Sequence, residues 1–148
     1  MTLSNRRSFY ILLCAAFAAG GCRSTGEPLA LLLRGNFVLR TVNGGPLPAD
    51  VSTRANYQIT LLDRTLQFDG KGLARMSQTV RVQGPTSAPA IEQSTANYRV
   101  RFTSETIYLD FLCPPNANCI TSGPTVAHLV DANTVVLGDS QRYVYVRR

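Results

Sequence analysis

The chain has 148 residues and a formal net charge of +6 at pH 7, from 15 Lys and Arg residues against 9 Asp and Glu residues. This length is sufficient for one domain with a hydrophobic core and is short for two. The basic residues are scattered along the chain, whereas nucleic-acid binders concentrate them on one face. The composition therefore predicts a single globular domain with no nucleic-acid partner.

The N-terminal residues have the order of a bacterial export signal. Arg6 and Arg7 form a positive region, residues 9–19 form an apolar stretch of 11 residues, and small residues then lead to Cys22. This stretch is too short for the hydrocarbon core, which takes about 20 helical residues, so a cleaved signal is expected. The two arginines also resemble a twin-arginine signal, and the general secretory route is the alternative.

Residues 19–22, Ala-Gly-Gly-Cys, resemble a lipobox, at which bacterial lipoproteins are cleaved and acylated. The resemblance implies that Cys22 becomes a lipidated N-terminus that anchors the protein to a membrane. Arg23 is not the aspartate associated with inner-membrane retention, which favours the outer membrane, facing the periplasm or the cell surface. Ordinary signal peptidase cleavage is the alternative, because Ala16-Phe17-Ala18 also fits a small-x-small site. The predicted segments are a lipoprotein signal peptide over 1–21, a lipidated N-terminus and tether over 22–34, and a β-barrel domain over 35–148.

From residue 35 onward, short segments alternate apolar and polar residues. Tyr57, Ile59 and Leu61, for example, are separated by Gln58 and Thr60. A period of two residues places one set of side chains against a core and the other toward water. No segment has a sustained apolar stripe of helical period, so little helix is expected. The predicted strands are 37–42, 56–62, 65–69, 73–82, 96–103, 106–113, 125–130, 134–138 and 142–147.

Eight or nine short strands joined by turns are typical of an up-and-down barrel or a two-sheet sandwich. We favour an all-β, antiparallel, up-and-down barrel of about eight strands, because closure leaves no free edge strands. A barrel of this size is usually filled by its own side chains, so a packed interior is expected, with a ligand cavity as the alternative. The aromatic residues that could line such a cavity are Tyr57, Phe68, Tyr98, Phe102, Phe111, Tyr143 and Tyr145.

Two cysteines remain beyond Cys22, and they lie close together in the sequence. Cys113 and Cys119 flank the turn-forming residues 114–118, Pro-Pro-Asn-Ala-Asn. In an oxidising envelope compartment this arrangement predicts a disulfide. A metal or redox pair is the alternative, although no histidine or third thiol lies nearby.

The sequence contains no recognisable catalytic or metal-binding pattern. His128 is its single histidine, no serine lies in a G-x-S-x-G elbow, and the carboxylates are dispersed. The Asp69-Gly70-Lys71-Gly72 segment lacks the spacing of a phosphate-binding loop and is explained by a hairpin turn. We therefore expect no enzyme activity, no metal and no cofactor. The alternative of a secreted hydrolase requires a hydroxyl and a carboxylate beside His128.

Both ends of the predicted domain resemble a known class of protein. Residues 35–39, with 42–44 and 46–48, resemble the opening strand and turn of small bacterial lipocalin-like lipoproteins of unassigned function, and residues 143–148 are similar to their final strand. The resemblance implies a small antiparallel barrel in the cell envelope and carries over no functional residues. We predict a lipid-anchored, non-catalytic protein that binds a small apolar ligand or an envelope partner. A filled barrel with a purely structural or protein-interaction role is the alternative.

Overall fold

The computed structural model describes residues 33–54, 56–103, 106–119, 123–138 and 140–148. These residues form strands and connecting segments, and they include no helix that could span a membrane. The strands in chain order are β1 (Gly35–Val42), β2 (Gly45–Pro46), β3 (Ala49–Arg54), β4 (Tyr57–Phe68), β5 (Leu73–Gln83), β6 (Ala90–Phe102), β7 (Thr106–Leu112), β8 (Thr125–Asp131), β9 (Thr134–Leu137) and β10 (Tyr143–Arg147).

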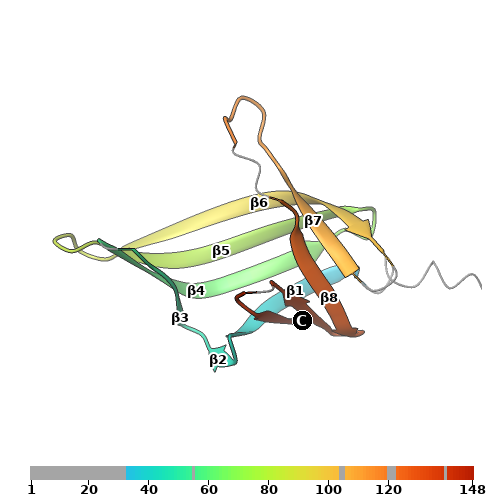
Figure 1. The fold of residues 1–148 in the computed structure, drawn as a ribbon, viewed down its shortest axis with the longest axis horizontal. Coiled ribbons are helices and arrows are strands. Elements are labelled where there is room, and N and C mark those ends of the chain that lie inside the picture. Colours follow the sequence, from blue (N-terminus) through green and yellow to red (C-terminus); the bar gives the residue numbers. More distant parts are fainter. Residues whose placement is uncertain (1–32, 55, 104–105, 120–122, 139) are drawn as a thin grey trace, which may run out of the picture.

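Eight of these strands form a closed antiparallel barrel (Figure 1). From β4 to β10 each strand pairs with the next along the chain, and β1 closes the ring by pairing with both β10 and β4. At the closure, Phe37 of β1 lies opposite Arg147 of β10 on one side and Leu66 of β4 on the other. The predicted all-β, antiparallel, up-and-down barrel is confirmed.

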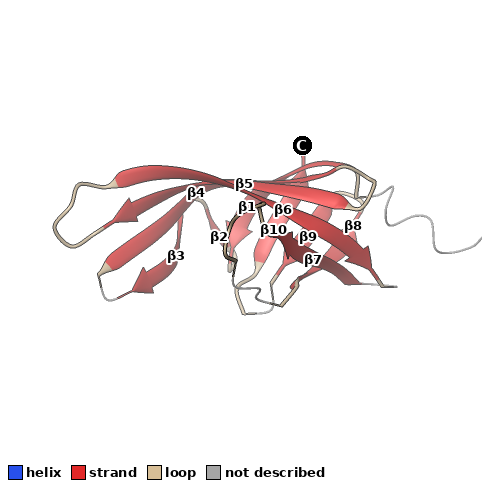
Figure 2. Ribbon diagram, turned by 90° about the horizontal axis from the view of Figure 1, so that it is seen from above, coloured by secondary structure: helices blue, strands red, loops and turns tan. Residues whose placement is uncertain are grey.

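Part of the sheet extends beyond this ring (Figure 2). β1 pairs with β4 only over residues 65–68, and β3 takes over the same edge of β4 over residues 57–61. On the other side, β7 pairs with β6 only from Asn97 onward. The strand ends therefore form a four-stranded projection, which we call the ledge. It consists of β3, residues 57–61 of β4, residues 80–83 of β5 and residues 90–93 of β6.

The structure corrects the predicted strand pattern around the ledge. The predicted strands 56–62 and 65–69 are one strand, β4, with a bulge between Leu61 and Asp63 that changes which residues face inward. β6 begins at Ala90, six residues before the predicted start at 96, and β3 was not predicted. β3 and the first residues of β6 lie outside the ring, where a strand need not bury one face, so their apolar alternation is weak.

The end of the barrel opposite the ledge is tightly packed. Leu33 is 1% exposed and lies beside Phe68, Val100 and Phe102 at that end. The Phe37 and Phe68 rings meet edge to face, with centroids 5.7 Å apart. This end agrees with the expectation of an interior filled by side chains. The buried core consists of Leu33, Phe37, Leu39, Val42, Leu61, Leu66, Phe68, Ala74, Val100, Ile107, Leu109, Ala127, Val135, Leu137 and Tyr145.

Candidate functional site

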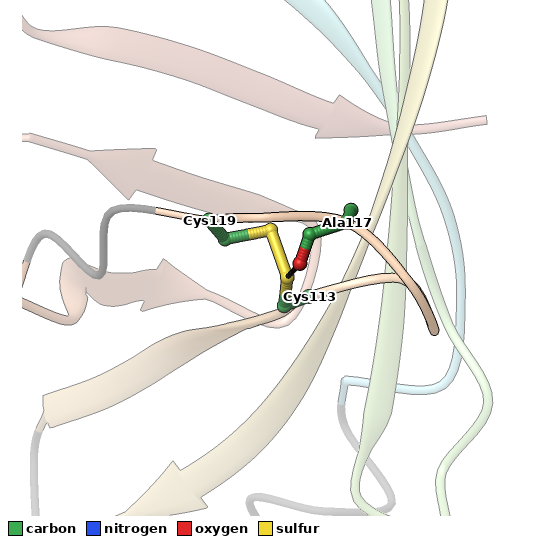
Figure 3. Close-up of a disulfide and its surroundings, with 3 residues drawn as sticks. All are labelled: Cys113, Ala117 and Cys119. Carbon is green, nitrogen blue, oxygen red and sulfur yellow. Dashed lines mark hydrogen bonds between the residues drawn. A yellow bond between two sulfur atoms is a disulfide. The ribbon is translucent and has the colours of Figure 1, made fainter.

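The predicted cysteine pair lies in a loop that follows β7 and projects from the barrel (Figure 1). Cys113 and Cys119 form a disulfide, with Cα atoms 5.9 Å apart, as the sequence predicts (Figure 3). The Cys113 Sγ is also 3.2 Å from the Ala117 carbonyl oxygen. This is a sulfur–oxygen contact, since a disulfide sulfur carries no proton. Closing so short a loop stabilises the fold by about 2 kcal/mol in the chain-entropy treatment.

Two other predicted features do not form a chemical site in the described structure. Cys22, the signal peptide over 1–21 and the tether as far as residue 32 lie outside the described residues. His128 is exposed on β8, opposite Thr106 and Val136, and its side chain has no hydrogen bond or ion pair with any described residue. This geometry gives no support to the hydrolase alternative. Within the same residues, no group of three His, Cys, Asp or Glu side chains is placed to hold a metal ion.

The aromatic residues divide into two groups. Tyr57, Phe102 and Phe111 are exposed, by 55%, 37% and 40% respectively, so the prediction that they could line a cavity is wrong for these three. The four inward-facing or core-packed aromatic residues are Phe68, Tyr98, Tyr143 and Tyr145. Of these, Tyr98 and Tyr143 line an open chamber inside the barrel, next to the ledge.

The chamber has a volume of about 290 Å³. This is close to the lower end of the range typical of small-molecule sites, roughly 300–1,000 Å³. The barrel is therefore packed at one end and hollow at the other, which corrects the expectation of a filled interior. The chamber is lined by Arg64 of β4, Met76 and Gln78 of β5, Ser94, Ala96 and Tyr98 of β6, Thr125 of β8, Leu137 of β9, Tyr143 of β10, and Gly138, which follows β9.

A row of hydrogen-bonded side chains crosses the chamber wall. Arg64, Gln78 and Ser94 lie opposite one another on β4, β5 and β6. Arg64 donates from Nε and Nη2 to Gln78 Oε1, at 3.0 and 2.6 Å, and Gln78 Nε2 donates to Ser94 Oγ at 3.1 Å. Because a guanidinium has five N–H donors, three of those of Arg64 are not used in these bonds.

Three tyrosines surround the Arg64 guanidinium. Its carbon lies 4.7 Å from the centroid of the Tyr143 ring, and the Tyr143 hydroxyl donates to Gln141 Oε1 at 2.5 Å. Burial raises the pKa of Tyr145 to about 12, and the Arg64 charge counteracts part of this rise. Burial likewise raises the pKa of Tyr98, again opposed by Arg64. Both hydroxyls are therefore protonated at neutral pH and close to a positive charge.

The Tyr145 side chain is fully buried, and its hydroxyl has no hydrogen-bond partner of normal geometry among the described residues. Among all the residues that the structure describes, the single ion pair is Arg101–Asp110, at 2.5 Å, between two strand residues on the barrel surface. No described carboxylate pairs with Arg64. The chamber wall thus combines a cation with unused hydroxyl and N–H donors.

The sequence interpretation did not single out Arg64, although a signal was present. Ile59 and Leu61 occupy odd positions of the apolar alternation, whereas Leu66 and Phe68 occupy even positions. This change of phase requires a bulge between the two pairs. Arg64 lies two residues before Leu66 and therefore shares the inward face with it. Without the bulge, Leu61 and Arg64 would lie on opposite faces of the sheet.

Comparison of the chain with known protein families, with curated proteins and with solved structures finds no match. The site must therefore be interpreted from its own geometry and chemistry.

Proposed function

We propose that this protein is a lipid-anchored cell-envelope protein whose barrel binds one small ligand in the chamber, without catalysing a reaction. The chamber itself carries this proposal, because it is a cavity inside a small barrel, lined by both apolar and polar groups. Met76, Ala96 and Leu137 supply the apolar lining. Gln78 and Ser94, two residues from Met76 and Ala96 on the same strands, supply with Arg64 the means to orient a ligand.

The envelope location is supported by two independent features. The disulfide between Cys113 and Cys119 is of the kind that persists in an oxidising compartment. The residues before Cys22 resemble a lipobox, and acylation there would place the barrel at a membrane surface. We propose the outer membrane, with the domain facing the periplasm or the cell surface.

Filling the chamber is expected to abolish ligand binding. Ala96 lines the chamber from β6, and Ala96→Phe places a ring in the cavity. The uncharged fluorophore N-phenyl-1-naphthylamine should bind the wild-type protein saturably, with increased emission in the apolar environment. Its affinity for Ala96→Phe is expected to be at least tenfold weaker, as measured by fluorescence titration of proteins with unchanged far-UV circular dichroism.

Thr95→Phe is the matched control for this experiment. Thr95 is the neighbour of Ala96, is exposed, and contacts Ser77 on the outer surface, so the added ring lies outside the chamber. Its affinity for the fluorophore should equal that of the wild type. Equal binding of the fluorophore by Ala96→Phe and the wild type would contradict the proposed function.

Substitution of Cys22 tests the membrane anchor. When the full chain is produced in bacteria with radiolabelled palmitate, the wild-type protein and Cys14→Ser should both incorporate label, because Cys14 lies within the proposed signal peptide. Cys22→Ser should incorporate none, since it lacks the acylated thiol. Intact-mass spectrometry of the membrane-extracted wild type should show a chain that begins at an acylated Cys22. An unmodified Cys22 in that spectrum would exclude the anchor.

A further inference from the structure

We propose that the ligand of the chamber is an amphipathic anion, with a carboxylate or phosphate headgroup against Arg64 and an apolar tail along the ledge. This inference rests on the proposed function, because it names the chemical class of the ligand for the same chamber.

The first argument is the charge of Arg64. Its side chain is partly buried inside the barrel, and no described carboxylate pairs with it. Removing a cation from water is unfavourable unless an opposite charge or strong hydrogen bonds replace the lost hydration. Two bonds to Gln78 and the contact with the Tyr143 ring provide part of this compensation. A bound anion would provide the rest, because a guanidinium binds carboxylate and phosphate groups through parallel hydrogen bonds.

The second argument is the surplus of donors around Arg64. Arg64 lines the chamber and has N–H donors that its bonds to Gln78 do not use. Ser94 Oγ accepts a bond from Gln78, which leaves its own proton available. Because Arg64 and Ser94 both line the chamber, an acceptor that enters it can take up their unused donors. An anionic headgroup is an acceptor that can serve several donors at once.

The third argument is the apolar surface that continues from the chamber mouth. Val80 lies two residues beyond Gln78 on the same face of β5, and Val82 follows it on the ledge. Ile59 lies opposite Val82, and Tyr57, which is 55% exposed, is next on the same face of β4. The other face of the ledge is polar, with Gln58, Thr60 and Arg81 in the intervening positions.

The ledge therefore offers an apolar strip to the part of a ligand that leaves the chamber. This strip favours an amphipathic molecule over an inorganic ion. Glu92 shares the face and lies opposite Val80, but it is exposed and makes no ion pair with a described residue. Its charge stays in water, so the bound part of the tail is expected to be uncharged.

Three probes with the same tail test the headgroup: octanoate, octyl phosphate and octan-1-ol, each titrated into the full wild-type protein by isothermal calorimetry. At least one of the two anions is expected to bind tenfold or more tightly than the alcohol. Which anion binds more tightly distinguishes a carboxylate ligand from a phosphate ligand. Acetate and inorganic phosphate, which lack the tail, should bind at least tenfold more weakly than the matching octyl anion.

Substitution of Arg64 tests the assigned partner. Arg64→Met should reduce the affinity of the preferred octyl anion to that of octan-1-ol, whereas Arg64→Lys, which keeps the charge, should lose less. Arg81→Met is the matched control, because Arg81 is exposed on the outer face of the ledge, and it should bind as the wild type does. Circular dichroism establishes that each variant is folded.

The outcomes separate the two proposals. If wild-type protein binds octan-1-ol as tightly as both anions, or if Arg64→Met binds the anion unchanged, the anionic ligand is wrong while the proposed binding function stands. If the wild type binds neither the octyl probes nor N-phenyl-1-naphthylamine, the proposed function is wrong and this inference fails with it.

Discussion

Replacing Phe37 with alanine is expected to lower the free energy of unfolding by about 3–5 kcal/mol, the range for removing a large aromatic ring from a packed core. Phe37 is 0% exposed, and its ring meets Phe68 edge to face. The Arg147 guanidinium also lies 4.7 Å from the ring centroid. Moreover, β1 is the strand that joins β10 to β4, so a cavity at Phe37 weakens the closure of the ring.

Phe102→Ala is the matched control, because it removes the same ring from a side chain that is 37% exposed. Its expected loss is about 1 kcal/mol, since less apolar surface is returned to water and a smaller cavity forms. Urea denaturation of the disulfide-bonded proteins measures both values. Equal losses for Phe37→Ala and Phe102→Ala would show that closure of the ring does not depend on Phe37.

Tyr145 is expected to make the fold sensitive to alkaline pH. A tyrosine titrates near pH 10 in an unfolded chain, whereas burial raises the pKa of Tyr145 to about 12 in the native protein. The native state therefore holds this proton more tightly than the unfolded state. The contribution of this proton to the free energy of unfolding is complete below pH 10 and is lost as the pH rises from about 10 to about 12. A difference of about two pKa units corresponds to about 2–3 kcal/mol.

Tyr145→Phe should remove this alkaline loss. The difference in unfolding free energy between the wild type and Tyr145→Phe should shift by about 2–3 kcal/mol in favour of the variant between pH 10 and pH 12. At pH 7 the variant should be as stable as the wild type or more so, because the buried hydroxyl it removes has no hydrogen-bond partner of normal geometry among the described residues. Tyr57→Phe, at an exposed position, should retain the wild-type profile. If the free energy of unfolding depends on pH in the same way for the wild type and Tyr145→Phe, Tyr145 is not the cause of the alkaline loss of stability.

Local sequence patterns predicted the features that depend on nearby residues. The alternation in β7 and β10 indicated strands because each buries one face, as Ile107, Leu109 and Tyr145 show. The Cys113–Cys119 pair was predictable because a short turn-forming segment brings its two ends together without help from the rest of the fold. The start of β6 in the ledge was harder to predict, since residues 90–95 are exposed and so carry no apolar alternation.

The fold class and the disulfide follow from local patterns, because alternation and turn-forming residues act over a few positions. That the barrel is packed beside Leu33 and hollow beside Arg64 follows instead from contacts between distant strands. The position of Arg64 depends on one bulge in β4, and its surroundings depend on β5, β6 and β10, which are distant in sequence. A cavity is set by how strands pair around the ring and by which side chains then meet. A local sequence pattern cannot specify the position of such a cavity, because the side chains that line it meet only when the barrel closes.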